Sequence, residues 1–232
     1  MKLCCAPVLA ALALALAGCG ERTEPAVQPA ATASASPALE VPVMGREIRI
    51  LALGDSLFAG YGLRRGESYP ARLETALRAR GINARIANAG VSGDTSAGGL
   101  ARLAFSLGSQ QQPPDLVIIS LGGNDLLRGL PPAQTRANLD AILSELRHRK
   151  IPPLLMGLLA PPNLGSDYRT DFDAIYPALA RKYQAGLVPF FLQAVADKPD
   201  LVQQDHVHPT AAGIEEIVAA TVYEVAGAVK RS

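Results

Sequence analysis

The sequence predicts a three-layer α/β/α sandwich built around a five-stranded parallel sheet. Five short runs rich in aliphatic residues alternate with amphipathic stretches, and strands that are buried on both faces of a parallel sheet have this composition. Hydrophobic residues make up 49% of the 232 residues and charged residues 19%, which is the balance of a globular protein with one sizeable core. We therefore expect one folded domain, with its site at the carboxyl ends of the strands.

The expected strands are separated by helical patterns, of which two are clear. A helix is predicted over residues 133–149, because aliphatic residues from Leu139 to Leu146 recur at helical spacing before a basic end. A second helix follows Thr210, where apolar residues fall on one stripe. The strands are expected over residues 48–53, 84–88, 116–121, 154–158 and 187–190.

The first residues have the layout of a secretory signal, in which Lys2 precedes an apolar stretch and then small residues. Residues 1–18 are the predicted signal peptide, residues 19–45 a flexible tether rich in Ala, Pro and Ser, and residues 46–232 the folded domain. The Leu-Ala-Gly-Cys sequence that ends at Cys19 resembles the lipobox of bacterial lipoproteins. The alternative is an ordinary signal peptide that is cut nearby, with Cys19 as an idle thiol.

The lipobox resemblance implies that Cys19 becomes a lipidated amino terminus, which anchors an exported protein to a bacterial membrane on its periplasmic side. Gly20, in place of Asp after the cysteine, resembles the sorting pattern for the outer membrane of Gram-negative bacteria. Cys4 and Cys5 lie upstream of the cut, so no disulfide is expected in the mature protein.

Charge and aromatic content limit the class of partner. Lys and Arg total 22 against 21 Asp and Glu, so the formal net charge is +1 and the chain has no bulk positive charge for binding nucleic acid. Aromatic residues make up 5% of the chain and Trp is absent, so stacking platforms for bases are scarce. The expected partner is a small molecule.

Three short polar blocks each follow an expected strand. Ser56 lies in a Gly-Asp-Ser-Leu turn after the first strand, Gly93 lies in Ser-Gly-Asp-Thr after the second, and Asn124 lies in Gly-Gly-Asn-Asp after the third. An exposed serine hydroxyl suits a nucleophile, and a backbone N–H together with a side-chain amide could bind an oxyanion. Each block alone is also ordinary turn chemistry. Phe58 stands where a Gly-x-Ser-x-Gly elbow needs its second glycine, so that elbow does not fit.

A fourth block, Asp-His-Val-His-Pro, precedes the last helix and holds two of the three histidines. His208 is fixed by the following proline, and Asp205, three residues earlier, can bond one of its ring nitrogens. His206 is the expected bystander, and His148 is a solvated residue at a basic helix end. A metal site made by Asp205, His206 and His208 is the alternative, but no companion His or Cys cluster supports it.

In this order the four blocks resemble those that name the SGNH, or GDSL, hydrolases, and the match covers the chain from about residue 48 to its end. The arylesterase, thioesterase I and lysophospholipase L1 branch is the most similar. The resemblance implies the flavodoxin-like SGNH fold, a catalytic set of Ser56, Asp205 and His208, and an oxyanion hole made by Ser56, Gly93 and Asn124. No metal or organic cofactor is implied.

The implied activity is that of a serine esterase acting through an acyl-serine intermediate on aryl or short- and medium-chain acyl esters, with thioesters and lysophospholipids as further substrates. Loops at residues 92–100, 126–131 and 161–169 are expected to grip the substrate. One alternative is an acyl- or acetyltransferase, or a deacetylase, that acts on envelope glycans with the same machinery. Another is a non-catalytic binding lipoprotein, which would have no need of all four blocks.

Overall fold

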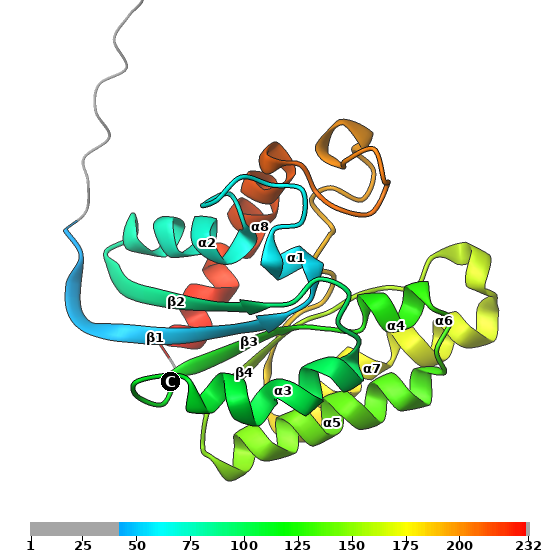
Figure 1. Cartoon of the computed structure of the whole chain (residues 1–232), viewed down its shortest axis with the longest axis horizontal. Coiled ribbons are helices and arrows are strands. Elements are labelled where there is room, and N and C mark those ends of the chain that lie inside the picture. Colours follow the sequence, from blue (N-terminus) through cyan, green and yellow to red (C-terminus); the bar gives the residue numbers. More distant parts are fainter. Residues whose placement is uncertain (1–41, 231–232) are drawn as a thin grey trace, which may run out of the picture. The chain divides into compact units, whose positions relative to one another are not determined.

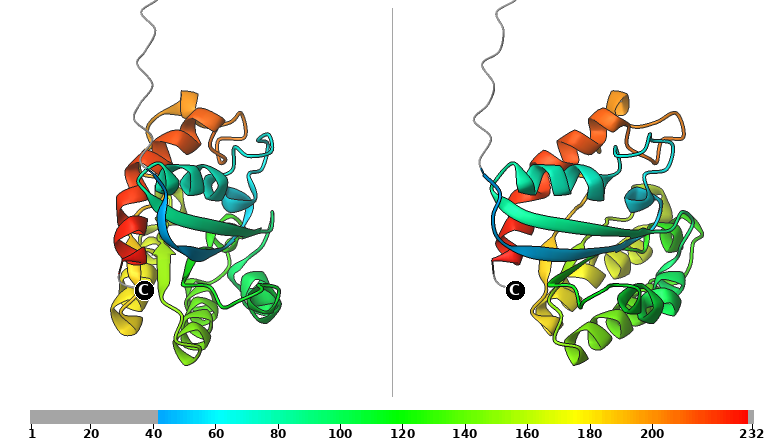
Figure 2. Two further views of the ribbon diagram at one scale, coloured as in Figure 1. Left: turned by 90° about the vertical axis from the view of Figure 1, so that its left-hand side faces the viewer. Right: turned by 60° about the vertical axis from the view of Figure 1, so that its left-hand side comes forward.

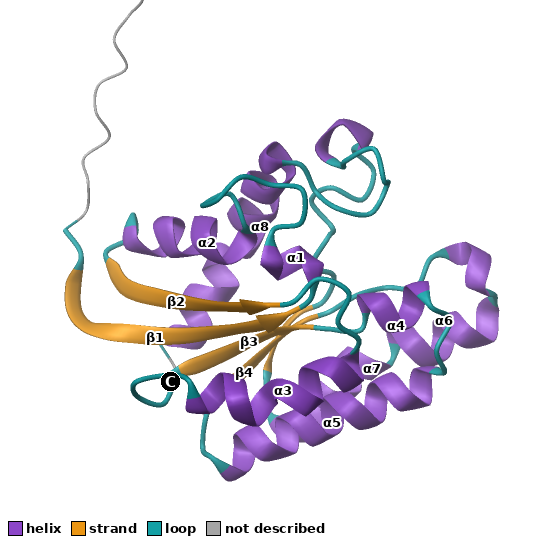
Figure 3. Ribbon diagram, viewed as in Figure 1, coloured by secondary structure: helices purple, strands orange, loops and turns teal. Residues whose placement is uncertain are grey.

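The structure, a computed structural model, describes residues 42–230. Five parallel strands form one sheet in the order β2-β1-β3-β4-β5, and the labelled arrows in Figure 3 all point the same way. The predicted fold class is confirmed, and each predicted strand is found. The strands are β1 (Met44–Gly54), β2 (Ile82–Gly90), β3 (Leu116–Ser120), β4 (Pro153–Met156) and β5 (Gly186–Val188).

Helices cover both faces of the sheet (Figures 1 and 2). On one face lie α2 (Tyr69–Arg78) and α8 (Ala211–Val229), and on the other lie α3 (Ser96–Gly108), α5 (Pro132–His148) and α7 (Ile175–Tyr183). Shorter helical segments lie in the connections. They are α1 (Ser56–Ala59), α4 (Gly123–Leu127), η1 (Pro162–Leu164), α6 (Ser166–Asp173) and η2 (Pro199–Leu201).

Both helices predicted from periodicity form, and the sequence explains where they begin. Pro132 opens α5, where its missing N–H would have no partner in any case. The Thr210 hydroxyl caps α8 by accepting a hydrogen bond from the Gly213 N–H at 3.2 Å. This cap fixes the start of the last helix directly after the Asp-His-Val-His-Pro block.

Burial on both faces holds for β3 and for the carboxyl-terminal halves of β1 and β4, and not for the edges of the sheet. Every residue of β3 is buried, whereas Ala84 is the one buried residue of β2. The expectation that all strands are buried on both faces is therefore wrong for the edge strands β2 and β5, of which β5 has Val188 alone buried, because an edge strand has a neighbour on one side only. β1 also begins at Met44, earlier than predicted, since the Met44 N–H donates to the Gly81 carbonyl at 3.2 Å.

The predicted signal peptide, Cys19 and residues 19–41 of the predicted tether lie outside the described residues. No helix within residues 42–230 combines the length and apolar character needed to span a bilayer.

The strand order reverses between β1 and β3, which are neighbours in the sheet although β2 separates them in the chain. The helices α2 and α5, which follow β1 and β3, pack on opposite faces of the sheet, so the chain turns opposite ways after these two strands. The carboxyl ends of two such strands are where a doubly wound sheet forms its ligand crevice. Ser56 follows β1 directly and Asn124 follows β3, so both lie at this crevice.

Candidate active site

Ser56 begins the short helix α1 immediately after β1. The Phe58 ring packs directly against Gly54 in this turn. A Cβ added to Gly54 would lie 2.6 Å from Cδ2 of that ring, so only glycine fits here. The Asp55 carboxylate caps α1 by accepting a hydrogen bond from the Leu57 N–H at 3.0 Å. Ser56 is left half-buried at the edge of the sheet.

The structure brings His208 and Asp205 to this serine. Nε2 of His208 lies 2.8 Å from the Ser56 Oγ, and Nδ1 of His208 lies 2.7 Å from Asp205 Oδ2. The other Asp205 oxygen accepts the N–H groups of Val207 and His208, each at 3.0 Å. These backbone bonds, that of His208 first, outweigh partial desolvation and together with the imidazole lower the pKa of Asp205 to about 2.

The other histidines lie elsewhere, as predicted. His206 is exposed in a left-handed conformation with φ +58° at the tip of the same turn, and His148 is exposed at the end of α5. The ring of Tyr61 lies against the His208 imidazole, with 4.5 Å between ring centroids. Within residues 42–230, no three His, Cys, Asp or Glu side chains are grouped so as to hold a metal ion.

The groups expected to bind an oxyanion come from three separate segments. Gly93 has φ +84°, a conformation that favours glycine, and its carbonyl accepts a hydrogen bond from Arg128 Nη2 at 2.8 Å. The Asn124 amide Nδ2 donates to the Asp94 carbonyl at 2.9 Å, which leaves its second N–H free. Within residues 42–230, neither the Ser56 N–H nor the Gly93 N–H donates to another protein group.

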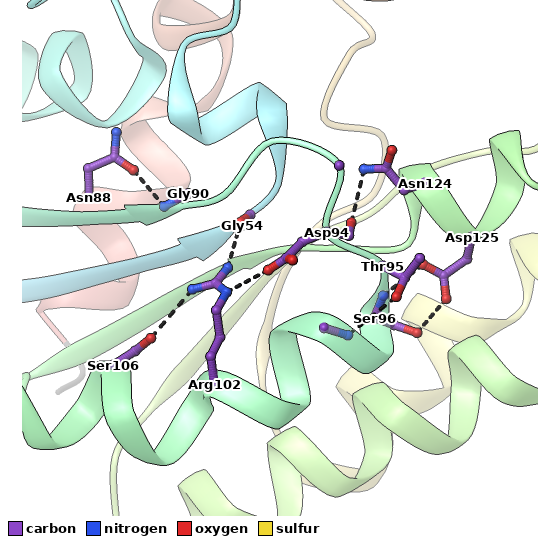
Figure 4. Close-up of polar contacts among 12 residues, drawn as sticks. Gly54, Asn88, Gly90, Asp94, Thr95, Ser96, Arg102, Ser106, Asn124 and Asp125 are labelled. Atoms are coloured by element: carbon purple, nitrogen blue, oxygen red, sulfur yellow. Dashed lines mark hydrogen bonds and ion pairs between the residues drawn. The ribbon is translucent and has the colours of Figure 1, made fainter.

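A buried carboxylate, Asp125, ties the start of α3 to α4 (Figure 4). It is 1% exposed and accepts hydrogen bonds from the Ser96 N–H at 2.7 Å, from the Ser96 hydroxyl and from the Thr135 hydroxyl at 3.2 Å. Because Asp125 follows Asn124 and Ser96 follows the Gly93 loop closely, these bonds hold two of the donor segments together.

Asp55 is a second buried carboxyl group, and no pattern in the sequence separates it from ordinary turn residues. It is 2% exposed at the wall of the cavity beside Ser56. Burial raises the pKa of Asp55 to about 6, against the opposing effects of the Leu57 N–H bond and the His208 charge.

The cavity beside Ser56 is small and apolar, with a volume of about 160 Å³. Leu126 and Leu127 line it, so the loop expected at 126–131 contributes. The loops expected at 92–100 and 161–169 do not line the cavity. The first is helical from Ser96, where α3 begins, and η1 and α6 occupy most of the second. The apolar lining is Leu57, Leu126, Leu127, Leu158, Leu159, Phe190, Leu192 and Val207.

Residues 52–215 match the model of the GDSL-like lipase/acylhydrolase family. The chain belongs to this family. It is 42% identical over 163 residues to the esterase TesA of Pseudomonas aeruginosa, covering 70% of this chain and 80% of that protein. It is also 42% identical over 161 residues to an arylesterase of Vibrio mimicus, covering 69% and 80%, and over 160 residues to thioesterase 1/protease 1/lysophospholipase L1 of Escherichia coli K12, covering 69% and 74%.

Solved structures agree with this assignment. The SGNH-hydrolase family esterase AlinE4 is 68% identical, with a TM-score of 0.69, and the match covers 80% of this chain and 98% of that one. Structures of AlinE4 variants, one with a serine and one with an aspartate replaced by alanine, match at 68% and 67% identity with the same TM-score of 0.69. The family and the branch predicted from the sequence are confirmed.

Proposed function

We propose that this member of the family is a serine hydrolase of carboxylic esters that acts through an acyl-serine. One observation carries the proposal: a continuous hydrogen-bonded line runs from the Ser56 Oγ through the imidazole of His208 to the Asp205 carboxylate, with separations of 2.8 and 2.7 Å. Nucleophile, base and orienting acid stand in the order that acyl transfer requires.

In the first half of the reaction, Nε2 of His208 takes the Ser56 proton as Oγ bonds to the ester carbonyl carbon. Asp205 holds Nδ1–H, which keeps Nε2 free to act as the base. The imidazolium then gives its proton to the leaving alcohol oxygen, and the acyl-serine remains. In the second half, a water molecule repeats the attack with His208 again as base, and the acid is released.

Negative charge develops on the carbonyl oxygen in both halves. The Ser56 N–H, the Gly93 N–H and the free N–H of Asn124 are the donors for this oxyanion. The leucine-lined cavity of about 160 Å³ suits an apolar acyl or aryl group, which favours aryl and short- to medium-chain acyl esters as substrates. The relatives named arylesterase and thioesterase 1/protease 1/lysophospholipase L1 make thioesters and lysophospholipids the next substrates to test.

The two AlinE4 variants support these assignments. The serine replaced there stands at position 13 of that chain and the aspartate at position 162, which is the same separation as that of Ser56 and Asp205. A shared separation of this length, in chains that are two-thirds identical, supports the roles proposed for Ser56 and Asp205.

An active-serine phosphonate probe tests the proposal. The adduct should form on the Ser56 peptide of the wild type, in step with loss of ester hydrolysis, because phosphonates bond covalently to an activated hydroxyl. Ser56→Ala should take up no probe and hydrolyse no ester, whereas Ser166→Ala, which removes an exposed hydroxyl on α6, should behave as wild type. Ester hydrolysis that persists in Ser56→Ala would overturn the proposal.

The proposal includes export and lipid anchoring at Cys19, supported by the lipobox resemblance. Labelled palmitate supplied to a Gram-negative host should be incorporated into the wild-type chain and into Cys5→Ala, whose change lies upstream of the expected cut. Cys19→Ala should lose the label. Equal labelling of the two variants would show that Cys19 is not the anchor.

A further inference from the structure

Arg102, on α3, makes two bonds to segments of the active site although it does not line the cavity (Figure 4). Its Nη2 donates to the Gly54 carbonyl at 2.7 Å, and its Nε lies 2.5 Å from Asp94 Oδ2. Gly54 stands two residues before Ser56, and Asp94 directly follows Gly93. One guanidinium therefore joins the nucleophile turn to the loop that supplies the Gly93 N–H.

The connection continues to the third donor segment. The Asp94 carbonyl accepts the Asn124 amide at 2.9 Å, so a single path runs from the Gly54 carbonyl through Arg102 and Asp94 to Asn124. The Gly54 carbonyl also accepts the Val91 N–H at 2.9 Å, so the loop is tied to β1 on both sides of Gly93.

The chemistry of the pair suits a fixed geometry. Arg102 and Asp94 are 19% and 18% exposed, so solvent and salt screen their attraction less than that of a surface pair. A guanidinium is planar and presents its donors at fixed angles, so the bonds to Gly54 and Asp94 constrain each other.

We propose that Arg102 and Asp94 are positioning residues that set the spacing of the oxyanion donors on Ser56, Gly93 and Asn124. The inference rests on the proposed function. Such donors must lie about 2.7–3.1 Å from the developing oxyanion, and a displacement of about 1 Å can cost roughly 10²-fold in rate. Because neither residue of the pair lines the cavity beside Ser56, its loss lowers kcat while KM stays nearly unchanged.

Steady-state hydrolysis of a short-chain p-nitrophenyl ester tests this. Arg102→Gln and Asp94→Asn should each lower kcat about 10- to 100-fold and change KM by less than about threefold. Arg102→Lys should recover part of the loss, since it keeps the charge without the planar fork. The matched control is Arg149→Gln, which removes an exposed pair with Glu145 on α5 and should leave both constants unchanged.

The double variant Arg102→Gln/Asp94→Asn should lose no more than the larger single loss, because the two residues act as one unit. Thermal unfolding is followed for every variant. If Arg102→Gln does not fold, the kcat of the nearly isosteric Asp94→Asn variant tests the positioning role. A folded variant with wild-type kcat, or with raised KM alone, overturns the positioning role and leaves the proposed function intact. A wild type without esterase activity overturns the proposed function and this inference with it.

Discussion

The two ends of the sheet differ in which side chains are buried and which are exposed. At the carboxyl ends of the strands the carboxylates of Asp55 and Asp125 are buried, whereas Leu127 and Leu159 are 61% and 46% exposed. At the amino ends charged groups pair at the surface, as Arg46 does with Asp115 and Arg149 with Glu145. Soluble proteins normally bury leucine and expose aspartate, so the carboxyl end departs from what stability alone would favour. This departure marks the end of the molecule where chemistry, and not stability, determines the residues.

Size alone would point to the wrong end. A hollow of about 340 Å³ lies at the amino ends, between Leu116, Arg147 and Lys150, and none of its lining residues is a serine, cysteine or histidine. The cavity beside Ser56 has less than half this volume. What distinguishes the smaller cavity is the set of reactive groups that the strand ends bring to it.

The largest effect is expected at the proposed base. His208→Asn should lower kcat/KM at least about 10³-fold, because the asparagine amide cannot take the serine proton. The matched control is His206→Asn, two residues away, at an exposed left-handed position that asparagine tolerates. Ester hydrolysis and thermal unfolding are measured for both variants. Retained activity in His208→Asn, or an equal loss in His206→Asn, would remove the distinction between the two histidines.

The next largest effect is expected at the proposed oxyanion donor. Asn124→Ala should lower kcat about 10²- to 10³-fold with little change in KM, because its free N–H would act on the transition state. Asn83→Ala is the control at the other end of the sheet, where the Asn83 amide donates to the Gly45 carbonyl at 3.2 Å. Kinetics of both variants with one aryl ester make the comparison. A loss in KM instead of kcat for Asn124→Ala would mean that the amide binds the ground state.

The strands and the residues at their carboxyl ends could be predicted from the sequence for one shared reason. Hydrophobic runs predict strands, and parallel strands bring their carboxyl ends to one edge, so Ser56, Gly93 and Asn124 could be expected to lie together. His208 was separable from His206 because a proline and a helix start fix its place. Each of these inferences needs only local pattern and sheet topology.

The parts that sequence reasoning missed depend on packing between distant segments. Arg102 is an ordinary helical arginine in the sequence, and its role follows from the direction it takes toward Gly54, 48 residues earlier. The burial of Asp55 likewise depends on a distant segment, because Gly123 at the start of α4 lies so near that an added Cβ would be 3.2 Å from Asp55 Oδ2. The expectation of a loop over 92–100 is wrong from Ser96 onward for a related reason: the cap at Thr95 starts α3 inside a segment whose glycines suggest a loop.

A smaller effect, on stability, is expected at Asp55. Its pKa in the folded protein is about 6, above the ordinary 3.8. The protonated carboxyl therefore contributes to the free energy of unfolding in full below pH 4, and this contribution is lost as the pH rises through 6. Asp55→Asn mimics the protonated carboxyl, so it should raise the free energy of unfolding by about 1–3 kcal/mol at pH 8 and by little at pH 4. Urea unfolding from pH 4 to pH 8 measures the difference.

The control for this prediction lies at the amino end and has the opposite sign. Burial of Asp115 opposes ionisation, but hydrogen bonds from the Arg49 N–H and from Arg46 outweigh it and lower the pKa of Asp115. Asp115→Asn should therefore destabilise the protein above pH 4, with the deficit shrinking as the pH falls below 3.8. If Asp55→Asn also lowers the free energy of unfolding at pH 8, the ionised Asp55 does not destabilise the folded protein and the prediction is wrong.

The smallest effect is expected at the exposed pair of Arg149 and Glu145 on α5, whose side chains are 42% and 39% exposed. Such pairs four residues apart on a helix contribute about 0.3–0.5 kcal/mol, and salt screens them. Arg149→Ala should lower the free energy of unfolding by about that amount at low salt, by less in about 1 M salt, and leave ester hydrolysis unchanged. A loss above about 1 kcal/mol, or any loss of activity, would mean that the amino end is coupled to the site, because solvent-screened pairs cannot account for either.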